Sequence, residues 1–319
     1  MRKISAVICT YNRYDLLPKA IDSVLNQSLA RDEYKVIVVD NSPTNPRGLE
    51  FQQRYEKIDN LTYVIEPIPG LSNARNVAAR TCGTEYVAYL DDDAIAGRDW
   101  LAEICAAFDA FGPSAGIVGG KIDPIWGAPR PAWLHDDMLG MLTVVDWGKH
   151  RRELEPNEWI AGANVSFRVE ALLRIGGFQT NLGRIGSSSV LLSNEESQVV
   201  EALKSQGFSL IWAPAAQVSH LVDSARLNPS WIRKRMAWQA ISDFIADGSA
   251  VRERQLGYWN GVKSYFNSLP PSIRTTDGLF AEVTDPDLFK SQISGVYNLA
   301  MLLLIGSRER RTSYRPVQE

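Results

Sequence analysis

The first third of the chain alternates short apolar runs with stretches in which apolar residues recur at helical spacing. The pattern predicts strands at Ile4–Cys9, Tyr34–Asp40, Leu61–Ile65 and Tyr86–Leu90, and helices at Tyr14–Gln27 and Ser72–Arg80. The second strand is apolar along most of its length, which suits a parallel strand buried on both faces. The order of elements predicts an α/β fold with a mostly parallel sheet flanked by helices.

Beyond residue 112 the pattern is mixed, and after residue 228 it becomes helical. Strand-like runs occur at Ile117–Ile122, Glu158–Phe167 and Ser209–Ala213, with a helix at Glu195–Gln206 and an irregular Trp- and Pro-rich stretch over 124–158. Amphipathic helices are expected around 230–247, 256–268 and 287–306, with a Pro-containing break at Asn267–Asp277. We expect an α/β domain over 1–225, with parts 1–123 and 124–225, and a helical C-terminal region over 226–319.

Charge is distributed unevenly along the chain, whose net charge is −3. Residues 1–225 carry 21 Lys and Arg against 28 Asp and Glu, whereas residues 226–319 carry 13 against 9. An acidic body argues against nucleic acid as the main ligand, and a mildly basic end is compatible with an anionic membrane surface.

Three cysteines, Cys9, Cys82 and Cys105, lie in apolar stretches without C-x-x-C spacing. They indicate buried thiols in a reducing compartment rather than disulfides or a zinc site. The N-terminus lacks the features of a secretory signal, and the longest apolar run, Leu299–Ile305, is far too short to cross a bilayer. We expect a cytoplasmic protein, free or peripheral to the inner face of the membrane.

Candidate chemistry gathers in three loops that directly follow strands, namely Thr10–Arg13, Asp40–Pro46 and Asp91–Ala94. The carboxyl ends of parallel strands share one edge of a sheet, where ligands of α/β proteins bind. The third loop opens with three adjacent aspartates, whose mutual repulsion a divalent cation would relieve. The alternative is a solvated acidic turn.

Polar and basic residues of the other loops suit a nucleotide. Asp40 and Asn41 close the second strand, where they could bind a base or ribose or could cap a turn. The first loop supplies an aromatic ring, an amide and a guanidinium through Tyr11, Asn12 and Arg13. Gly70–Asn76 opens a helix and contains Arg75. Arginines near a helix N-terminus suit a pyrophosphate, although they could equally be solvated surface charges.

Four segments, in this order and spacing, resemble the nucleotide-sugar-binding half of the inverting glycosyltransferase family 2 enzymes with the GT-A fold: CTYNR, VVDNS, GLSNARN and YLDDD. The resemblance implies donor binding in 1–123 and an acceptor and catalytic part in 124–225. It implies that Tyr11 and Asp40 hold the nucleobase, that Thr10, Arg13 and Arg75 line the nucleotide and diphosphate, and that Asn12 and Asn41 belong to the donor site. It also implies that Asp91 and Asp92 contact the ribose and that Asp93, which ends the D-x-D pattern, binds Mn²⁺ or Mg²⁺.

The resemblance continues more loosely through WIAGANVSF (Trp159–Phe167), a Gly-Gly-Phe turn, and Glu195-Glu196 at the start of a helix. It implies that Glu196 is the catalytic base and Glu195 its neighbour. Many members have aspartate in the second position, so the base could be either residue. His220 closes WAPAAQVSH, a segment that in the family returns toward the metal, so the resemblance implies that His220 binds the metal or touches the diphosphate. Without the resemblance, the glutamates would be helix-terminal charges and the histidine a structural residue.

The implied reaction transfers a sugar, from a UDP-sugar as the expected donor, to a hydroxyl of a saccharide or lipid-linked acceptor in surface glycan synthesis. A base must deprotonate the acceptor on the face opposite the leaving diphosphate, which inverts the anomeric carbon. Two alternatives stay open. A sugar nucleotidyltransferase usually needs a Gly-rich loop after the first strand, whereas Thr10–Arg13 has no glycine. A non-catalytic sugar-nucleotide-binding protein would differ only in lacking turnover.

Several residues have no settled role. Three tryptophans could stack on a sugar or fill the core, namely Trp126, Trp133 and Trp159. Arg184 lies in a Gly/Ser-rich stretch that could close over the donor or merely connect two elements. The C-terminal region could form a dimer surface, an acceptor wall or an in-plane membrane anchor, the last built on Leu299–Ile305 with Arg308, Arg310 and Arg311. A buried helix with a solvated basic end is the alternative.

Overall fold

The computed structural model describes residues 2–180, 191, 194–246 and 250–313. The chain divides into two compact units. The first comprises Met1–Ile125, Thr143–Ser189 and Glu195–Leu221. The second comprises Trp126–Leu142, Val190–Asn194 and Val222–Glu319. Among the described residues, the second unit thus takes in Asn194 and the segment 126–142, which the sequence did not indicate.

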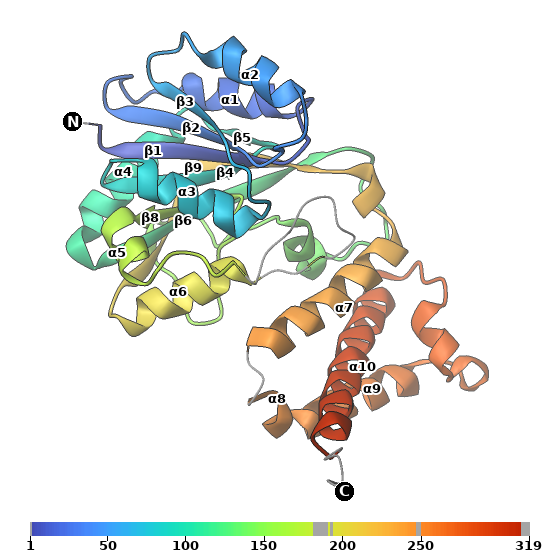
Figure 1. The fold of residues 1–319 in the computed structure, drawn as a ribbon. Helices are drawn as coiled ribbons and strands as arrows, with labels where there is room; N and C mark the ends of the chain where they lie inside the picture. The colour runs from blue at the N-terminus through green and yellow to red at the C-terminus, as the bar shows by residue number, and fades with distance from the viewer. Residues whose placement is uncertain (1, 181–190, 192–193, 247–249, 314–319) are drawn as a thin grey trace, which may run out of the picture. The chain divides into compact units, whose positions relative to one another are not determined.

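The N-terminal unit is a mixed sheet flanked by helices, which confirms the predicted α/β class (Figure 1). Its strands are β1 (Ile4–Thr10), β2 (Tyr34–Asp40), β3 (Leu61–Ile65), β4 (Tyr86–Asp91), β5 (Ala94–Ala96), β6 (Ala115–Trp126), β7 (Arg152–Glu153), β8 (Asn164–Arg168) and β9 (Ser209–Val222). Its helices are α1 (Leu17–Leu25), α2 (Arg47–Tyr55), α3 (Leu71–Thr81), α4 (Trp100–Phe111), α5 (Val169–Arg174) and α6 (Glu195–Ser205). The sheet runs in the order β3-β2-β1-β4-β8-β6-β9-β5, with β7 paired to β9.

The half of the sheet formed by β3, β2, β1 and β4 is parallel, as the apolar runs predict. The chain moves outward from β1 to β3 and then returns to β4, so right-handed crossovers require α3 to lie on the face opposite α1 and α2. Figure 1 shows this arrangement. The other half is antiparallel, with β8 against β4 and β6, and β9 against β5. Its strands bring distant residues back to the edge where β1 and β4 end.

Some predicted elements differ in extent. The run Glu158–Phe167 enters the sheet only at Asn164, because the segment before it crosses β6. The Ile160 side chain packs against Gly119 of β6, where an added Cβ would lie 2.0 Å from Ile160 Cγ2. The run Ser209–Ala213 continues to Val222 as β9. Helices α2 and α4 had no predicted counterpart. The three cysteines form no disulfide.

The C-terminal unit consists mainly of helices, as predicted: α7 (Pro229–Ala246), α8 (Ala250–Glu253), α9 (Gln255–Ser268) and α10 (Pro286–Ser313). Helix α10 packs against α7 and α9. From Pro286 to Ser307, α10 is long and apolar enough to cross a membrane by length and composition alone, with a mean hydropathy of 1.4, whereas the uninterrupted run Leu299–Ile305 is not. A third of that stretch (33%) is buried within the protein.

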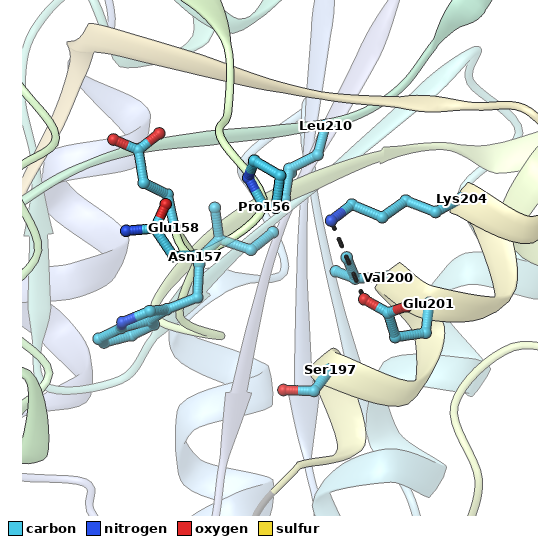
Figure 2. Close-up of a pocket in the computed structure, with 10 residues that line it drawn as sticks. Pro156, Asn157, Glu158, Ser197, Val200, Glu201, Lys204 and Leu210 are labelled. Atoms are coloured by element: carbon cyan, nitrogen blue, oxygen red, sulfur yellow. Dashed lines mark ion pairs between the residues drawn. The ribbon is translucent and has the colours of Figure 1, made fainter.

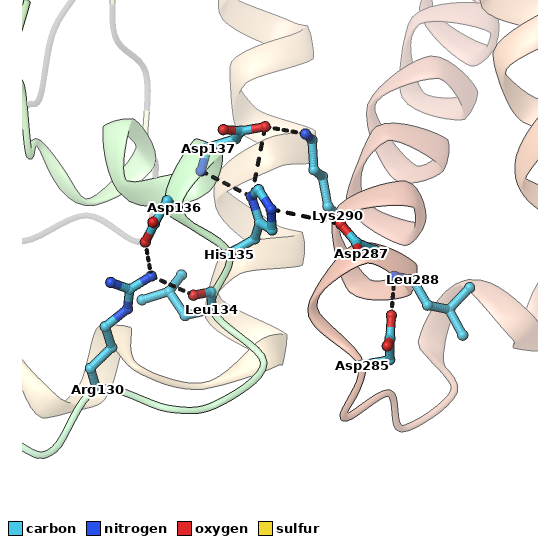
Figure 3. A network of polar contacts seen from close by, with 9 residues as sticks. All are labelled: Arg130, Leu134, His135, Asp136, Asp137, Asp285, Asp287, Leu288 and Lys290. Carbon is cyan, nitrogen blue, oxygen red and sulfur yellow. Dashed lines mark hydrogen bonds and ion pairs between the residues drawn. The ribbon is translucent and has the colours of Figure 1, made fainter.

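A polar network joins α10 to the segment 130–137 within this unit (Figure 3). His135 Nε2 lies 3.6 Å from Asp287 Oδ1, and Lys290 forms an ion pair with Asp137. Arg130 pairs with Asp136. All these groups are at least partly exposed, so the network orients the segment more than it stabilises the fold.

Candidate functional site

The carboxyl ends of β1 and β4 form the floor of the candidate site. These strands are neighbours at the point where strand order reverses, which is where open α/β sheets bind ligands. The register places Cys9 beside Asp91, and Thr10 beside Asp40. The Thr10 hydroxyl donates a hydrogen bond of 2.7 Å to Asp92 Oδ2. The end of β1 therefore holds the aspartate triplet directly.

Arg13 follows β1 and pairs with two of the three aspartates. Its guanidinium donates to Asp92 Oδ1 at 2.9 Å and to Asp93 Oδ2 at 2.8 Å, while 34% of its side chain stays exposed. The turn depends on Asn12, which has a left-handed backbone (φ 57°) that asparagine tolerates better than most residues. The Asn12 amide N–H donates to Ser42 Oγ at 2.8 Å. Part of the Arg13 side chain thus remains accessible to a ligand.

The two buried aspartates, Asp92 and Asp93, have pKa values shifted in opposite directions. Burial raises the pKa of Asp92 to about 7, against the opposing charge of Arg13. Burial acts on Asp93 in the same direction, but His220 and Arg13 outweigh it and hold the pKa of Asp93 well below its usual range. Asp93 is therefore the carboxylate that is charged across the physiological range.

His220 reaches this carboxylate from the far end of the sequence. Antiparallel pairing of β9 with β5 places His220 opposite Ala94, and its Nε2 lies 3.3 Å from Asp93 Oδ1. Both side chains are buried, and within the described residues neither Asp93 Oδ1 nor His220 Nδ1 has a hydrogen-bond partner. With Asp91 they offer ligand atoms within 4.8 Å of one another. Two carboxylates, an imidazole and orphaned buried polar atoms fit a divalent cation.

Arg75 connects the aspartate triplet to the acidic pair. Its side chain is 3% exposed, and its guanidinium lies 2.9 Å from Glu196 Oε1, 3.4 Å from Glu195 Oε1 and 3.8 Å from Asp91 Oδ1. The Tyr89 hydroxyl donates to the Arg75 carbonyl oxygen at 2.9 Å. The structure thus brings together the GLSNARN, YLDDD and Glu195-Glu196 motifs.

Gly162 and Asn76 were not singled out in the sequence, yet both hold this arrangement. A Cβ on Gly162 would stand 1.8 Å from Glu196 Oε1 and 2.3 Å from an Arg75 nitrogen, so only glycine leaves room for the ion pair. The Asn76 amide donates to the Phe178 carbonyl and accepts from its N–H, both at 2.8 Å. These positions lie inside the WIAGANVSF and GLSNARN segments, which was the available signal.

Asp40 and Asn41 lie behind the site surface. The Asp40 carboxylate has no exposed area and accepts hydrogen bonds from the hydroxyls of Tyr14 (2.8 Å) and Tyr63 (2.7 Å) and from the Ser42 N–H (3.0 Å). Asn41 donates to the Ile68 carbonyl and accepts from the Gly70 N–H, which fixes the entry to α3. In this structure both residues shape the edge rather than present their side chains to a base.

The remaining candidates are dispersed. Tyr11 is partly exposed and Asn12 exposed beside the β1 edge. Trp133 packs against Phe289 in the C-terminal unit, whereas Trp159 is 39% exposed. Arg184 and the rest of the stretch 182–189 lie outside the described residues.

Comparison with known proteins gives this geometry a context. The model of Glycosyl transferase family 2 matches residues 5–175. A glucosyl-dolichyl phosphate glucuronosyltransferase of Haloferax volcanii is 28% identical over 250 residues, which cover 77% of each chain. The succinoglycan biosynthesis protein ExoM of Rhizobium meliloti is 26% identical over 231 residues, covering 72% of this chain and 70% of ExoM.

Solved structures share the fold. The mannosyltransferase PcManGT of Pyrobaculum calidifontis, in complex with GDP-Man and Mn²⁺, aligns with a TM-score of 0.55 at 18% identity over 99% of this chain and 77% of its own. TarS 1–349 of S. aureus, in complex with UDP, aligns with a TM-score of 0.52 at 17% identity over 98% and 93%.

Proposed function

Because this chain belongs to glycosyl transferase family 2 and is a glycosyltransferase, we propose that it moves a sugar from a UDP-sugar to a hydroxyl of a saccharide or lipid-linked acceptor, with inversion. One observation carries the proposal. Arg75 contacts both Asp91 of the aspartate triplet and the Glu195-Glu196 pair, so a donor-binding motif and a candidate base share one site.

In this proposal, the donor half uses the groups at the ends of β1 and β4. Arg13 is the accessible cation for the diphosphate, since a third of its side chain is exposed while it rests on Asp92 and Asp93. Tyr11 and Asn12 would lie on either side of the bound nucleobase. Asp40 would stabilise this part of the site indirectly, by accepting the Tyr14 hydrogen bond. It would contact the base only by exchanging one of its present hydrogen bonds.

Asp93, His220 and Asp91 are the residues that would hold Mn²⁺ or Mg²⁺. A bound cation there would stabilise the negative charge that develops on the departing diphosphate. The GDP-Man and Mn²⁺ complex of the Pyrobaculum neighbour supports this choice of cofactor.

Glu196 is the proposed base and Glu195 its less accessible neighbour, with side chains 17% and 6% exposed. The Glu196 carboxylate would take the acceptor hydroxyl proton while that oxygen forms a bond to the anomeric carbon. The bond from this carbon to the diphosphate oxygen breaks on the opposite face, and the electron pair leaves with the nucleoside diphosphate. Arg75 holds the Glu196 carboxylate in place.

A lipid-linked acceptor, and a cytoplasmic location at the membrane surface, form the outer part of the proposal. The Haloferax relative is named for glucosyl-dolichyl phosphate and ExoM for succinoglycan biosynthesis. In α10, Leu303 is 61% exposed, whereas Met301 and Ile305 are buried. Flotation of the full chain with anionic vesicles would support membrane contact, and failure to float with either anionic or neutral vesicles would oppose it. A homodimer stays a prediction from the sequence.

Calorimetry tests the donor site. We expect UDP to bind more tightly than GDP or dTDP, and only with Mn²⁺ present. Asp93→Ala should abolish this binding, because it removes a cation ligand, whereas Glu196→Gln should bind normally and fail to turn over. Absence of nucleotide binding in every metal condition would contradict the donor site.

A further inference from the structure

A pocket of the N-terminal unit lies beside α6, the helix that begins with the acidic pair (Figure 2). Its volume of about 200 Å³ lies below the roughly 300–1,000 Å³ typical of sites for drug-sized molecules, so it suits a small group such as one sugar ring. One wall is the segment 156–160 and the other is the α6 face carrying Ser197, Glu201 and Lys204.

The lining combines an apolar floor with a polar rim. Ile160, Val200 and Leu210 supply the floor. Trp159 adds a large aromatic surface that is 39% exposed, and its indole is braced edge-on by Trp147, with ring centroids 6.2 Å apart. Aromatic rings pack well against the C–H face of a pyranose, because a sugar ring has an apolar face and a hydroxyl-bearing edge.

The charged rim groups already have partners. Glu158 accepts two hydrogen bonds of 2.6 Å from Arg152, and Lys204 lies 3.9 Å from Glu201. This leaves no surplus positive charge for a phosphate, while Asn157, Ser197 and the paired groups can still exchange hydrogen bonds with hydroxyls. The rim chemistry therefore favours a neutral saccharide over a nucleotide.

Both walls of the pocket contain residues close in sequence to Glu196 or to a residue that contacts it. Ser197 follows Glu196 in α6, and Gly162, against which the Glu196 carboxylate packs, comes three residues after Trp159. Three residues span at most about 10 Å. A saccharide in the pocket would therefore lie within one or two sugar units of Glu196.

We propose that this pocket is a subsite for a neutral pyranose unit of the acceptor, with Trp159 as its stacking platform. The inference rests on the proposed transferase function, since it assigns the pocket to the second substrate of that reaction. It also identifies the segment 156–160 as a determinant of acceptor choice that is separate from the donor edge.

Saturation-transfer NMR on the full chain tests the subsite, with methyl α- and β-pyranosides of gluco, galacto, manno and N-acetylglucosamine configuration as probes. We expect at least one probe to bind, and Trp159→Ala to weaken its binding by up to about tenfold, the loss that one good aromatic contact supports. Trp159→Phe should retain part of the affinity. Trp259→Ala, which removes an indole 49% exposed in the C-terminal unit, should leave probe binding unchanged.

UDP affinity with Mn²⁺, measured on the same samples, separates the two hypotheses and checks that Trp159→Ala is folded. Probe binding lost while nucleotide binding persists supports the subsite. No probe binding in the wild type, or equal binding in Trp159→Ala, overturns the subsite and leaves the donor site standing. If a probe bound at Trp159 in a protein that binds no nucleotide, the result would support a saccharide site and contradict the proposed donor site.

Discussion

At the residue scale, Arg75 is the most constrained group of the candidate site. The family resemblance implies that it lines the diphosphate, yet its side chain is only 3% exposed and its guanidinium faces Asp91, Glu195 and Glu196. A sequence identifies the residue type and its motif, but not which of several nearby anions uses the guanidinium donors. The same limit applies to Asp40, whose hydrogen bonds to Tyr14 and Tyr63 depend on folding of distant segments.

Arg75→Lys should lower turnover by about 100-fold, because a lysine keeps the charge but loses the planar geometry that places Glu196, and a misplacement of about 1 Å costs this much. The measurement is slow hydrolysis of the donor, followed as UDP release, together with calorimetry of UDP and Mn²⁺. Arg80→Lys, on the exposed side of the same helix, is the matched control. A loss of nucleotide affinity as large as the loss of turnover would instead make Arg75 a diphosphate ligand.

At the element scale, the parallel strands were the part of the chain that the sequence predicted best, because their runs are mostly apolar. β2 and β3 have their predicted bounds, and β1 and β4 extend one residue further. The antiparallel half was harder to predict from the sequence, since β9 continues through Pro214 and then alternates buried with partly or fully exposed residues. The approach of His220 to Asp93 comes only from the β5–β9 register, which no local pattern encodes.

The hydrogen bonds that Tyr14 and Tyr63 donate to Asp40, at the end of β2, should be lost at alkaline pH, and the stability of the fold should fall with them. Burial and the hydrogen bond to Asp40 raise the pKa of Tyr14 to about 12. The unfolded chain loses this proton near pH 10 while the folded chain keeps it, so stability is intact below pH 10 and falls as pH rises toward 12. Urea midpoints between pH 9 and 11.5 should therefore fall more steeply for the wild type than for Tyr14→Phe. Parallel slopes would contradict a perturbed tyrosine.

The ion pairs between α10 and the segment 130–137 should contribute little stability. Lys290 and Asp137 have side chains 46% and 58% exposed, and ion pairs between exposed side chains contribute little because water and salt screen them. We expect Lys290→Met to cause at most a small loss of stability in urea titrations. A larger loss would mean that this network holds the segment in place.

At the scale of the whole molecule, the two units are interleaved along the sequence. Asn194 belongs to the C-terminal unit, where it donates to Asp243 Oδ1 at 2.8 Å and accepts from Gln239 at 3.0 Å. The next residue, Glu195, begins α6 in the N-terminal unit. The simple boundary expected from composition, at residue 225, could not reveal this, because single residues within an irregular stretch carry no compositional signal.

A chain ending at residue 225 should consequently be impaired. It lacks Asp243 and Gln239, the partners of Asn194, as well as Lys290 and Phe289, which contact the segment 126–142. We expect limited proteolysis to cut this segment readily in the truncated protein and slowly in the full chain. Equal resistance of the two proteins would show that the N-terminal unit is self-sufficient.

The pairing of β5 with β9 also sets an order of events during synthesis. A nascent chain that has been made only through β5 already has all three aspartates, but the imidazole that faces Asp93 arrives with β9, more than a hundred residues later. Domains fold as units during synthesis, so the pairing that brings His220 to Asp93 forms only after β9 has been made. Capture of the proposed cation would then be among the last steps of maturation, and a chain broken before β9 would carry the donor motifs without one of the three proposed ligands.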